Sequence, residues 1–346
     1  MTKRTIKIIG TALGIVLLLS FYAQAQKAKT SNPQPQKNKE TGSLLLIEMN
    51  KMYGFVDKTC KIIIQPQFGS AEPFQEGLAR VSLGGKKGPW GYITKTGEII
   101  INPQFDSAGD FSEGLAVVEI AKRFGYVNRT GEMVINPQFD SAGDFSEGLA
   151  KVAIGKKYGY INKTGEIIIN PQFDSAGDFS EGLASVAVGK KYGYVDKTGK
   201  YIINPQFDTA SDFSEGLASV SVGKKYGYVD RTGKYIINPQ FDFAGDFSEG
   251  MAKVAISKRY GYINRTGKYI INPQFDFAGD FSEGMAVVEV SKKYGYIDKT
   301  GKYIINPQFD SALSFSEGLA LVEIKGKEGK TGYIDKTGKW TCNYTQ

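Results

Sequence analysis

The sequence contains no histidine, and it has only two cysteines and two tryptophans among its 346 residues. Histidine is the commonest general acid or base near neutral pH and the commonest metal ligand, so its absence removes the most frequent catalytic and metal-binding side chain. Two cysteines are too few for a thiolate zinc site in one chain, although Cys60 and Cys342 could form a disulfide in an oxidising compartment. We therefore expect no metal, no cofactor and no enzymatic activity.

Long hydrophobic runs are also scarce, and the longest lies at the N-terminus. Residues 1–25 predict a secretory signal peptide, with a basic start, an apolar core from Ile8 to Tyr22 and the cleavage pattern Ala23-Gln24-Ala25. An uncleaved anchor is the alternative, but the core is short for a membrane span of about 20 residues. We expect an exported protein that is not integral to the membrane after cleavage. It would lie in the periplasm, on the outer surface or in the extracellular medium.

Basic charge is less abundant in the body of the chain than the formal net charge of +7 indicates. Much of the excess lies in the signal peptide and in residues 26–43, a polar segment that we expect to be a flexible linker. Residues 44–346 are left close to neutral. A nucleic-acid-binding protein needs a clear basic excess to neutralise phosphates, so the sequence predicts no nucleic-acid partner.

What the sequence has in abundance is repetition, because nine near-copies of one unit fill residues 44–346. The phrase from Tyr192 to Phe207 returns 34 residues later, from Tyr226 to Phe241. A fixed period of this length is the signature of a repeat architecture. An active site needs several different residues in distinct roles, whereas here almost every residue has copies. This pattern favours a binding or structural role.

Each unit predicts three antiparallel strands. In one copy these are Leu183–Val188, Tyr192–Asp196 and Lys200–Asn204, which are rich in Val, Ile and Tyr. The segment Asp196-Lys197-Thr198-Gly199 predicts a type I turn that is closed by a left-handed glycine. Cys60 replaces this glycine in the first unit, which should cost about 1 kcal/mol if its φ stays positive.

The strand pattern alone favours an open architecture. No unit is split between the ends of the array, and three strands per unit is fewer than the usual four of a propeller blade. We therefore expect an open, twisted all-β array of nine units, with a closed β-propeller-like ring as the alternative. In an open array Cys60 and Cys342 would lie too far apart to bridge within one monomer, so an intramolecular disulfide would indicate the ring.

Aromatic side chains recur in columns that we expect to form the interfaces between units. A single unit of this size cannot bury enough surface to be stable alone, so its stability must come from its neighbours. The columns are Phe173, Phe207, Phe241 and Phe275; Phe179, Phe213, Phe247 and Phe281; and Tyr160, Tyr194, Tyr228 and Tyr262.

The unit resembles the WG (KWG) repeat of bacterial proteins. Trp90-Gly91-Tyr92-Ile93 carries the Trp-Gly pair of that family, and Phe179-Ser180-Glu181-Gly182-Leu183-Ala184 carries its characteristic ending. Most units have Tyr or Phe in place of the Trp, and Thr331 stands there in the last unit. The resemblance implies a β-rich tandem array, often exported, that mediates interactions, and it supplies no catalytic residues.

Two sets of side chains are candidates for ligand binding. Aromatic rings can stack on sugars, and the candidates are Trp90, Tyr158, Tyr192 and Tyr226, with packing between units as the alternative. The basic turns, such as Lys190-Lys191, could attract an anionic polymer, or they could simply be solvated turns. The acids Asp174, Asp178 and Glu181 lack the spacing of a calcium loop, and turn formation, capping or pairing with lysine explains them better.

We expect this chain to be an exported, non-catalytic protein that acts as a multivalent protein-interaction scaffold at the bacterial cell envelope. The alternative is a carbohydrate-binding array that recognises an envelope or extracellular polysaccharide. The sequence names no particular partner protein or glycan.

Overall fold

The computed structural model describes residues 44–326 and 329–345. The predicted signal peptide (residues 1–25) and the predicted linker (residues 26–43) lie outside the described residues and stay predictions. Within those two described ranges, no helix has the length and hydropathy that a membrane span requires.

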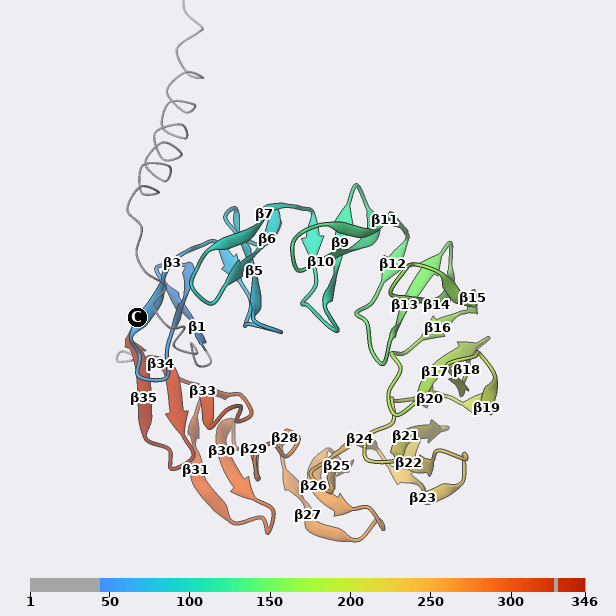
Figure 1. Cartoon of the computed structure of the whole chain (residues 1–346). Coiled ribbons are helices and arrows are strands. Elements are labelled where there is room, and N and C mark those ends of the chain that lie inside the picture. The colour runs from blue at the N-terminus through green and yellow to red at the C-terminus, as the bar shows by residue number, and fades with distance from the viewer. Residues whose placement is uncertain (1–43, 327–328, 346) are drawn as a thin grey trace, which may run out of the picture. The chain divides into compact units, whose positions relative to one another are not determined.

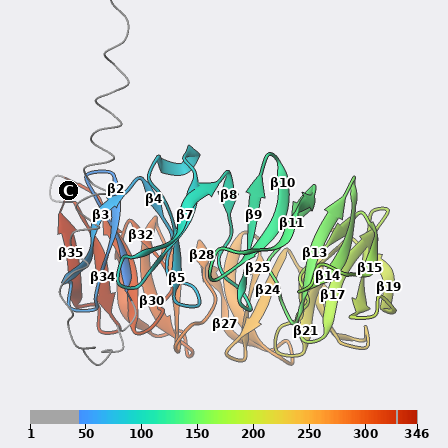
Figure 2. The ribbon, with the colours of Figure 1, turned by 45° about the horizontal axis from the view of Figure 1, so that its top comes forward.

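Nine antiparallel sheets of the described residues follow one another around a ring, as Figure 1 shows. Each sheet is one blade, and the arrangement is a nine-bladed β-propeller. The expectation of an open twisted array is therefore wrong, and the closed ring is correct. In Figure 2 the strands run between the two faces of the ring, and blade 1 (blue) lies beside blade 9 (red) in both views.

Among the described residues, blade 1 has three strands and each of the other eight blades has four, so the prediction of three strands per unit was also wrong. The strand that it missed comes directly after the last strand of the preceding blade and is only two residues long in seven of the eight blades. Two residues carry no periodic pattern that a sequence could reveal. These short strands are β4 (Ser70–Ala71), β8 (Ser107–Ala108), β12 (Ser141–Ala142), β16 (Ser175–Ala176), β20 (Thr209–Ala210), β24 (Phe243–Ser248), β28 (Phe277–Ala278) and β32 (Ser311–Ala312).

The next two strands of each blade form a hairpin whose turn carries the basic residues. The first strand of this hairpin is β1 (Leu45–Met49), β5 (Leu78–Ser82), β9 (Leu115–Ile120), β13 (Leu149–Ile154), β17 (Leu183–Val188), β21 (Leu217–Val222), β25 (Met251–Ile256), β29 (Met285–Val290) or β33 (Leu319–Ile324). The second is β2 (Met52–Val56), β6 (Trp90–Thr94), β10 (Arg123–Asn128), β14 (Lys157–Asn162), β18 (Lys191–Asp196), β22 (Lys225–Asp230), β26 (Arg259–Asn264), β30 (Lys293–Asp298) or β34 (Lys330–Asp335). In blade 2 the hairpin turn also holds a short 3-10 helix, η1 (Gly85–Lys87).

The last strand of each blade lies on the outer rim of the ring, so the short strand at the opposite edge of the sheet is innermost (Figure 1). The outer strands are β3 (Ile62–Phe68), β7 (Ile99–Phe105), β11 (Met133–Phe139), β15 (Ile167–Phe173), β19 (Tyr201–Phe207), β23 (Tyr235–Phe241), β27 (Tyr269–Phe275), β31 (Tyr303–Phe309) and β35 (Trp340–Thr345).

The glycine that follows the first aromatic residue of β18 makes room for a bulge in the outer strand β19. Tyr192 pairs with Phe207, but Tyr194 pairs with Ile203, so β19 carries extra residues opposite Gly193. A Cβ atom on Gly193 would lie 2.3 Å from the Ile203 carbonyl oxygen and 2.6 Å from the Pro205 nitrogen. Only glycine fits this close approach, which also explains how a proline is accommodated inside an outer strand.

The predicted turn after β18 is confirmed. The Gly199 amide donates to the Asp196 carbonyl at 2.9 Å, and Asp196 Oδ1 accepts from the amides of Thr198 and Lys200. Gly199 has φ +85°, and Cys60, at the same position in blade 1, has φ +70°. Cysteine therefore occupies a left-handed position that glycine fills in the later copies of the turn, as the sequence analysis expected.

The core lies between the blades, and the aromatic columns form it as expected. Tyr194 in blade 5 packs on Phe213 in blade 6 with ring centroids 4.8 Å apart, and both side chains are almost completely buried. The Tyr194 hydroxyl donates to the Ser211 carbonyl of blade 6 at 2.6 Å, and burial raises the pKa of this hydroxyl. Every interface from blades 1–2 to blades 8–9 has the same kind of ring pair.

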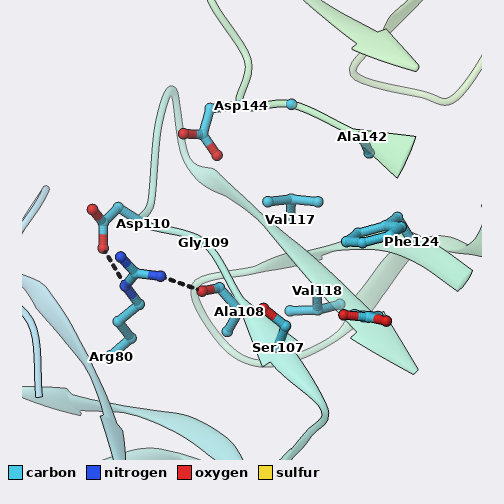
Figure 3. Close-up of a pocket in the computed structure, with 12 residues that line it drawn as sticks. Arg80, Ser107, Ala108, Gly109, Asp110, Val117, Val118, Phe124, Ala142 and Asp144 are labelled. Carbon is cyan, nitrogen blue, oxygen red and sulfur yellow. Dashed lines mark hydrogen bonds and ion pairs between the residues drawn. The ribbon is translucent and has the colours of Figure 1, made fainter. Parts of the chain in front are cut away.

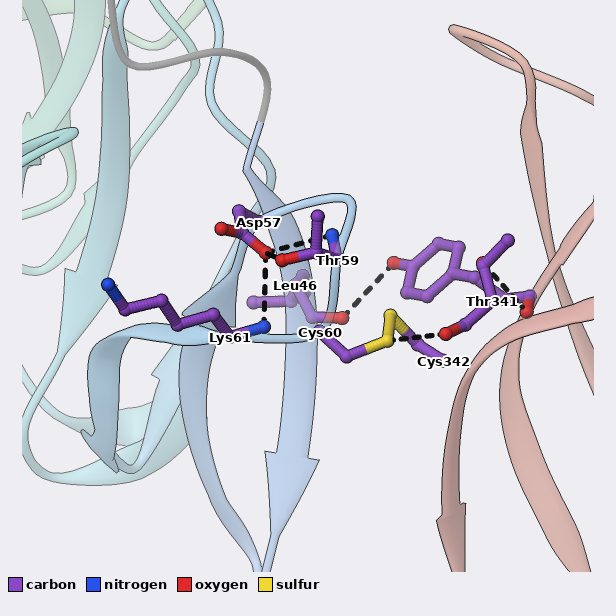
Figure 4. The surroundings of a disulfide bond; sticks show 8 residues. Leu46, Asp57, Thr59, Cys60, Lys61, Thr341 and Cys342 are labelled. Carbon is purple, nitrogen blue, oxygen red and sulfur yellow. Dashed lines mark hydrogen bonds between the residues drawn. A yellow bond between two sulfur atoms is a disulfide. The ribbon is translucent and has the colours of Figure 1, made fainter. Parts of the chain in front are cut away.

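The interface between blade 9 and blade 1 closes the ring, and it contains a hydrogen bond of the same kind as the other interfaces. The Tyr333 hydroxyl donates to the Leu46 carbonyl at 3.1 Å, as the Tyr194 hydroxyl does to the next blade. Cys60 and Cys342 form a disulfide at this interface (Figure 4). Closure therefore needs no strand exchanged between the ends, which is why the unbroken units in the sequence did not indicate a ring.

Candidate binding surface

Most of the polar residues that recur in every unit are used to join blades. The Ser180 hydroxyl donates to the Phe213 carbonyl of the next blade at 2.7 Å. The Glu181 carboxylate accepts from the Gly216 amide of the next blade at 2.9 Å. The Phe-Ser-Glu-Gly motif thus connects neighbouring blades, and the Glu181 carboxylate caps a backbone amide of the next blade.

The same joint includes a cation from the neighbouring turn. Lys197 in blade 5 donates to the Glu147 carbonyl of blade 4 at 2.8 Å and lies 3.1 Å from the Glu147 carboxylate. Burial alone would raise the pKa of Glu147, but the Lys197 ammonium and the Gly182 amide outweigh burial and lower it. Lys58 makes the same contact with Glu317 across the closing interface, at 2.8 Å to the carbonyl.

The two candidate lysines of one basic turn differ in their surroundings. Lys191 forms an ion pair with Asp208 of the next blade at 2.6 Å, and Asp208 also accepts from the Gly223 amide. The Lys191 ammonium, and then the Gly223 amide, lower the pKa of the Asp208 carboxyl. Lys190 is exposed, and no ion pair joins it to another described residue. The first lysine of such a turn is therefore the one available to a partner.

The four candidate aromatic residues also lie in different settings. Trp90 is only 9 % exposed, packs in a core cluster, and has the Arg80 guanidinium 5.7 Å from its ring centroid. Tyr158, Tyr192 and Tyr226 are half-buried near the basic turns. Of these three, Tyr226 alone contacts another partly exposed ring, that of Phe243 in blade 7.

Tyr226 is one end of an aromatic strip that our sequence analysis missed. The strip consists of five rings in blades 6, 7 and 8, each touching the next, and it is made of Tyr226, Phe243, Tyr260, Phe277 and Tyr294. It exists because phenylalanine stands at positions 243 and 277. Serine or threonine occupies the equivalent position in the other four-stranded blades, at Ser70, Ser107, Ser141, Ser175, Thr209 and Ser311.

A row of aspartates lies beside the inner strands and is the second charged feature of the ring. In Figure 3 the Arg80 guanidinium lies between Asp110, at 3.0 Å, and the Ala108 carbonyl, while Asp144 of the next blade has no such partner. A pocket of about 310 Å³ opens here. Burial, and then the charges of Asp110 and Asp178, raise the pKa of Asp144.

The row continues through the following blades, where some carboxylates have a cationic partner among the described residues and others do not. Lys151 pairs with Asp178 at 3.3 Å, whereas Asp212 has only the Ser185 hydroxyl at 3.3 Å. Burial and the Asp178 charge raise the pKa of Asp212. These carboxylates repeat from blade to blade, and they differ in the side chain that lies beside each of them.

Comparison with known proteins agrees with this architecture. The family described as "WG containing repeat" matches residues 53–86, 90–122, 124–158, 158–192, 192–226, 226–258, 260–294 and 294–327. No curated protein matches the chain. Among solved structures, the chain is similar to "Crystal structure of the eukaryotic initiation factor", with a TM-score of 0.64 and 11% identity over 88% of this chain and 95% of that one.

Two further structures are less similar. BamB from Moraxella catarrhalis has a TM-score of 0.45 and 10% identity, over 81% of this chain and 97% of that one. The dihydro-heme d1 dehydrogenase NirN has a TM-score of 0.48 and 8% identity, over 91% and 76%. At such identities the likeness concerns the fold alone. The eight tandem matches, by contrast, cover most of the chain, and they show that it belongs to the family of WG-repeat proteins.

Proposed function

We propose that this protein is an exported, non-catalytic scaffold that binds other proteins at the bacterial cell envelope. A propeller built of repeats suits a protein-interaction scaffold, because it presents a broad, rigid surface. The observation that carries the proposal is the use of the recurring polar groups. Ser180, Glu181, Tyr194 and Lys197 hold neighbouring blades together, and this structural use of the recurring groups supports a scaffold role.

The free groups lie where a partner could reach them. The hairpin turns with Lys190 and its equivalents all lie on one face of the ring, which we call the basic-turn face. Antiparallel pairing places the Asp196–Gly199 turn and its equivalents on the opposite face. Similar weak contacts repeated around one face add up through effective concentration, so binding would be multivalent.

Co-sedimentation of the mature protein with envelope fragments of its own organism tests this proposal. We expect binding to untreated fragments and loss of binding after the fragments have been treated with protease. Binding that survives protease would contradict a protein partner and favour the alternative, a carbohydrate-binding array. The absence of any saturable binding would contradict both and indicate a spacer.

Export has a separate test, because it depends on residues that the structure does not describe. The chain should be recovered outside the cytoplasm with an N-terminus at Gln26. A full-length protein that stays in the cytoplasm would contradict export, but it would leave the proposal of protein binding unaffected.

A further inference from the structure

We propose that the aromatic strip on blades 6–8 binds an extended segment of a partner protein in which apolar and acidic side chains alternate. This inference rests on the proposed scaffold function and names the chemistry that one part of the ring would recognise. The strip is a property of this chain's own sequence, because in the other four-stranded blades the two phenylalanine positions hold serine or threonine.

The rings are accessible although they touch one another. Phe243 and Phe277 are 37 % and 40 % exposed, and Tyr226, Tyr260 and Tyr294 are half-buried. Large exposed phenylalanines packed into a continuous row are unusual on a protein surface that has no partner. In blades 4 and 5 the corresponding tyrosines, Tyr158 and Tyr192, have no such phenylalanine beside them, so the strip is local.

The spacing of the rings fits a polypeptide. Consecutive centroids along the strip lie 6.2, 5.9, 6.3 and 6.1 Å apart. In an extended chain, side chains on the same face repeat about every 6.6–6.8 Å, since each residue rises about 3.3–3.4 Å. Alternate residues of an extended segment could therefore meet successive rings of the strip.

The tilt of the rings also favours side chains over flat ligands. Neighbouring rings make interplanar angles of 45°, 64°, 55° and 64°, so they form V-shaped notches and no coplanar platform. The flat face of a sugar ring stacks best on a flat aromatic surface, whereas a notch receives an aliphatic or aromatic side chain. Recognition of an extended peptide by pockets for alternate side chains is a common binding mode.

The charges beside the strip indicate which charged side chains the ligand would carry. Lys224, Lys258 and Lys292 are exposed, and each precedes a tyrosine of the strip by two residues. The second cation of each turn is held by an aspartate, as in the Lys225–Asp242 and Arg259–Asp276 pairs. The first lysines have no ion-pair partner among the described residues, so acidic side chains of the ligand would pair with them.

Glu289 marks the end of the strip. It lies opposite both Phe277 and Tyr294 in blade 8, where blade 7 has Ala255. Burial and the Glu289 charge raise the pKa of Tyr294. An acidic residue at this end would repel acidic side chains of the ligand, so these should pair mainly with Lys224 and Lys258.

Selection of random peptides on the whole mature protein tests the proposal. We expect enriched peptides in which apolar and acidic residues alternate, and we expect their affinity to fall at least about tenfold in the double variant Phe243→Ser/Phe277→Ser. Serine is native at this position in other blades, so this variant should keep its fold. The matched control is Ser141→Ala/Ser175→Ala, which changes the equivalent positions of two blades outside the strip and should leave affinity unchanged.

The lysines have their own variant. Replacing Lys224, Lys258 and Lys292 together by Gln should weaken the same peptides and flatten the salt dependence of binding. Selected peptides that bind the double phenylalanine variant equally well would overturn the inference. Binding of a glycan that depends on Phe243 and Phe277, in place of peptide binding, would overturn it too.

Co-sedimentation separates this inference from the function on which it rests. If the Phe243→Ser/Phe277→Ser variant still binds protease-sensitive envelope material as tightly as the natural protein, the scaffold function stands and the strip is not its contact site. Loss of that binding in the double phenylalanine variant, with retention in the Ser141→Ala/Ser175→Ala control, would support both.

Discussion

Cys60 and Cys342 are joined by a disulfide that holds their Cα atoms 5.3 Å apart, although 282 residues separate them in the sequence. The bond lies at the interface of blades 9 and 1, the one interface among the described residues without a Tyr/Phe or Phe/Phe ring pair. The described part of blade 1 has no short inner strand and no phenylalanine that packs on Tyr333. The disulfide takes the place of a different contact, in which the turn glycine of one blade faces an isoleucine of the preceding blade, as Gly199 faces Ile169.

Removing this bond should destabilise the ring. We expect Cys60→Ser/Cys342→Ser to lose about 2–5 kcal/mol of unfolding free energy, because the bridge constrains a very long loop in the unfolded chain. Chemical denaturation of the oxidised natural protein and the variant measures the difference. Equal midpoints would show that the closing interface is stable without the bond.

Cys60 also allows the cost of its backbone conformation to be measured separately. Under reducing conditions Cys60→Gly should be more stable than Cys60→Ser by about 1 kcal/mol, because glycine adopts the left-handed φ of +70° without strain.

Peptide mapping without reductant should recover Cys60 linked to Cys342 in the natural monomer. A linkage between two molecules would contradict closure of one ring.

Gly193→Ala should be severely destabilising, by about 2–4 kcal/mol, because the added methyl would overlap the Ile203 carbonyl and the Pro205 nitrogen. The matched control is Gly189→Ala in the neighbouring basic turn. No atom lies within 4 Å of a Cβ there, and Ala121 is native at the same position of another blade. The control should cost no more than about 1 kcal/mol in thermal or denaturant unfolding.

Tyr194→Phe should cost about 1–2 kcal/mol, because it leaves the Ser211 carbonyl at a buried interface without its donor. Tyr192→Phe is the control, since no described residue accepts a hydrogen bond from that hydroxyl and the ring is half-buried. If both variants lose the same unfolding free energy, the Tyr194 hydrogen bond adds nothing, and ring packing alone stabilises the interface.

The aspartate row predicts a pH dependence of stability. The pKa of Asp212 is raised from 3.8 in the folded protein, so the folded state binds its proton more tightly than the unfolded state does. Stability is then lost as the pH rises above about 3.8, through the folded pKa. Asp212→Asn should be more stable than the natural protein at pH 7, by no more than about 1 kcal/mol for a partly exposed group.

This gain should vanish below about pH 4, where Asp212 is protonated in both states. Asp280→Asn provides the opposite control, because Asp280 pairs with Lys253 at 3.1 Å and its removal leaves that cation alone. An Asp212→Asn variant with the same stability as the natural protein at every pH would contradict the raised pKa that burial and the Asp178 charge give Asp212.

The local parts of this structure were predictable from the sequence. The Asp196–Gly199 turn follows from side-chain chemistry, and the left-handed φ of Cys60 follows from its place in that turn. The packing of Tyr194 on Phe213 follows from their periodicity, because aromatic columns in a repeat must be buried between units. All of these depend on residues close in sequence or on the period itself.

Closure was not predictable in this way, since it depends on a small rotation at each interface that accumulates over the whole chain. The two-residue strand Ser175–Ala176 was missed because its neighbours across the sheet, and not its own residues, make it a strand. The aromatic strip left a visible signal, Phe243 and Phe277 in place of serine. Only the ring shows that these residues bring the tyrosines of neighbouring blades into contact.

The disulfide has a genetic consequence. Nearly identical repeats in a gene invite recombination that removes or adds a 34-residue unit. The interfaces from blades 1–2 to blades 8–9 share the same kind of ring pair, so a shortened chain could still stack its units, but its two cysteines would meet only if the remaining blades completed a circle. Deleting residues 192–225 should therefore leave two free thiols in the monomer. In the oxidised protein, the Cys60–Cys342 disulfide therefore indicates that the chain has the number of repeats that closes the ring.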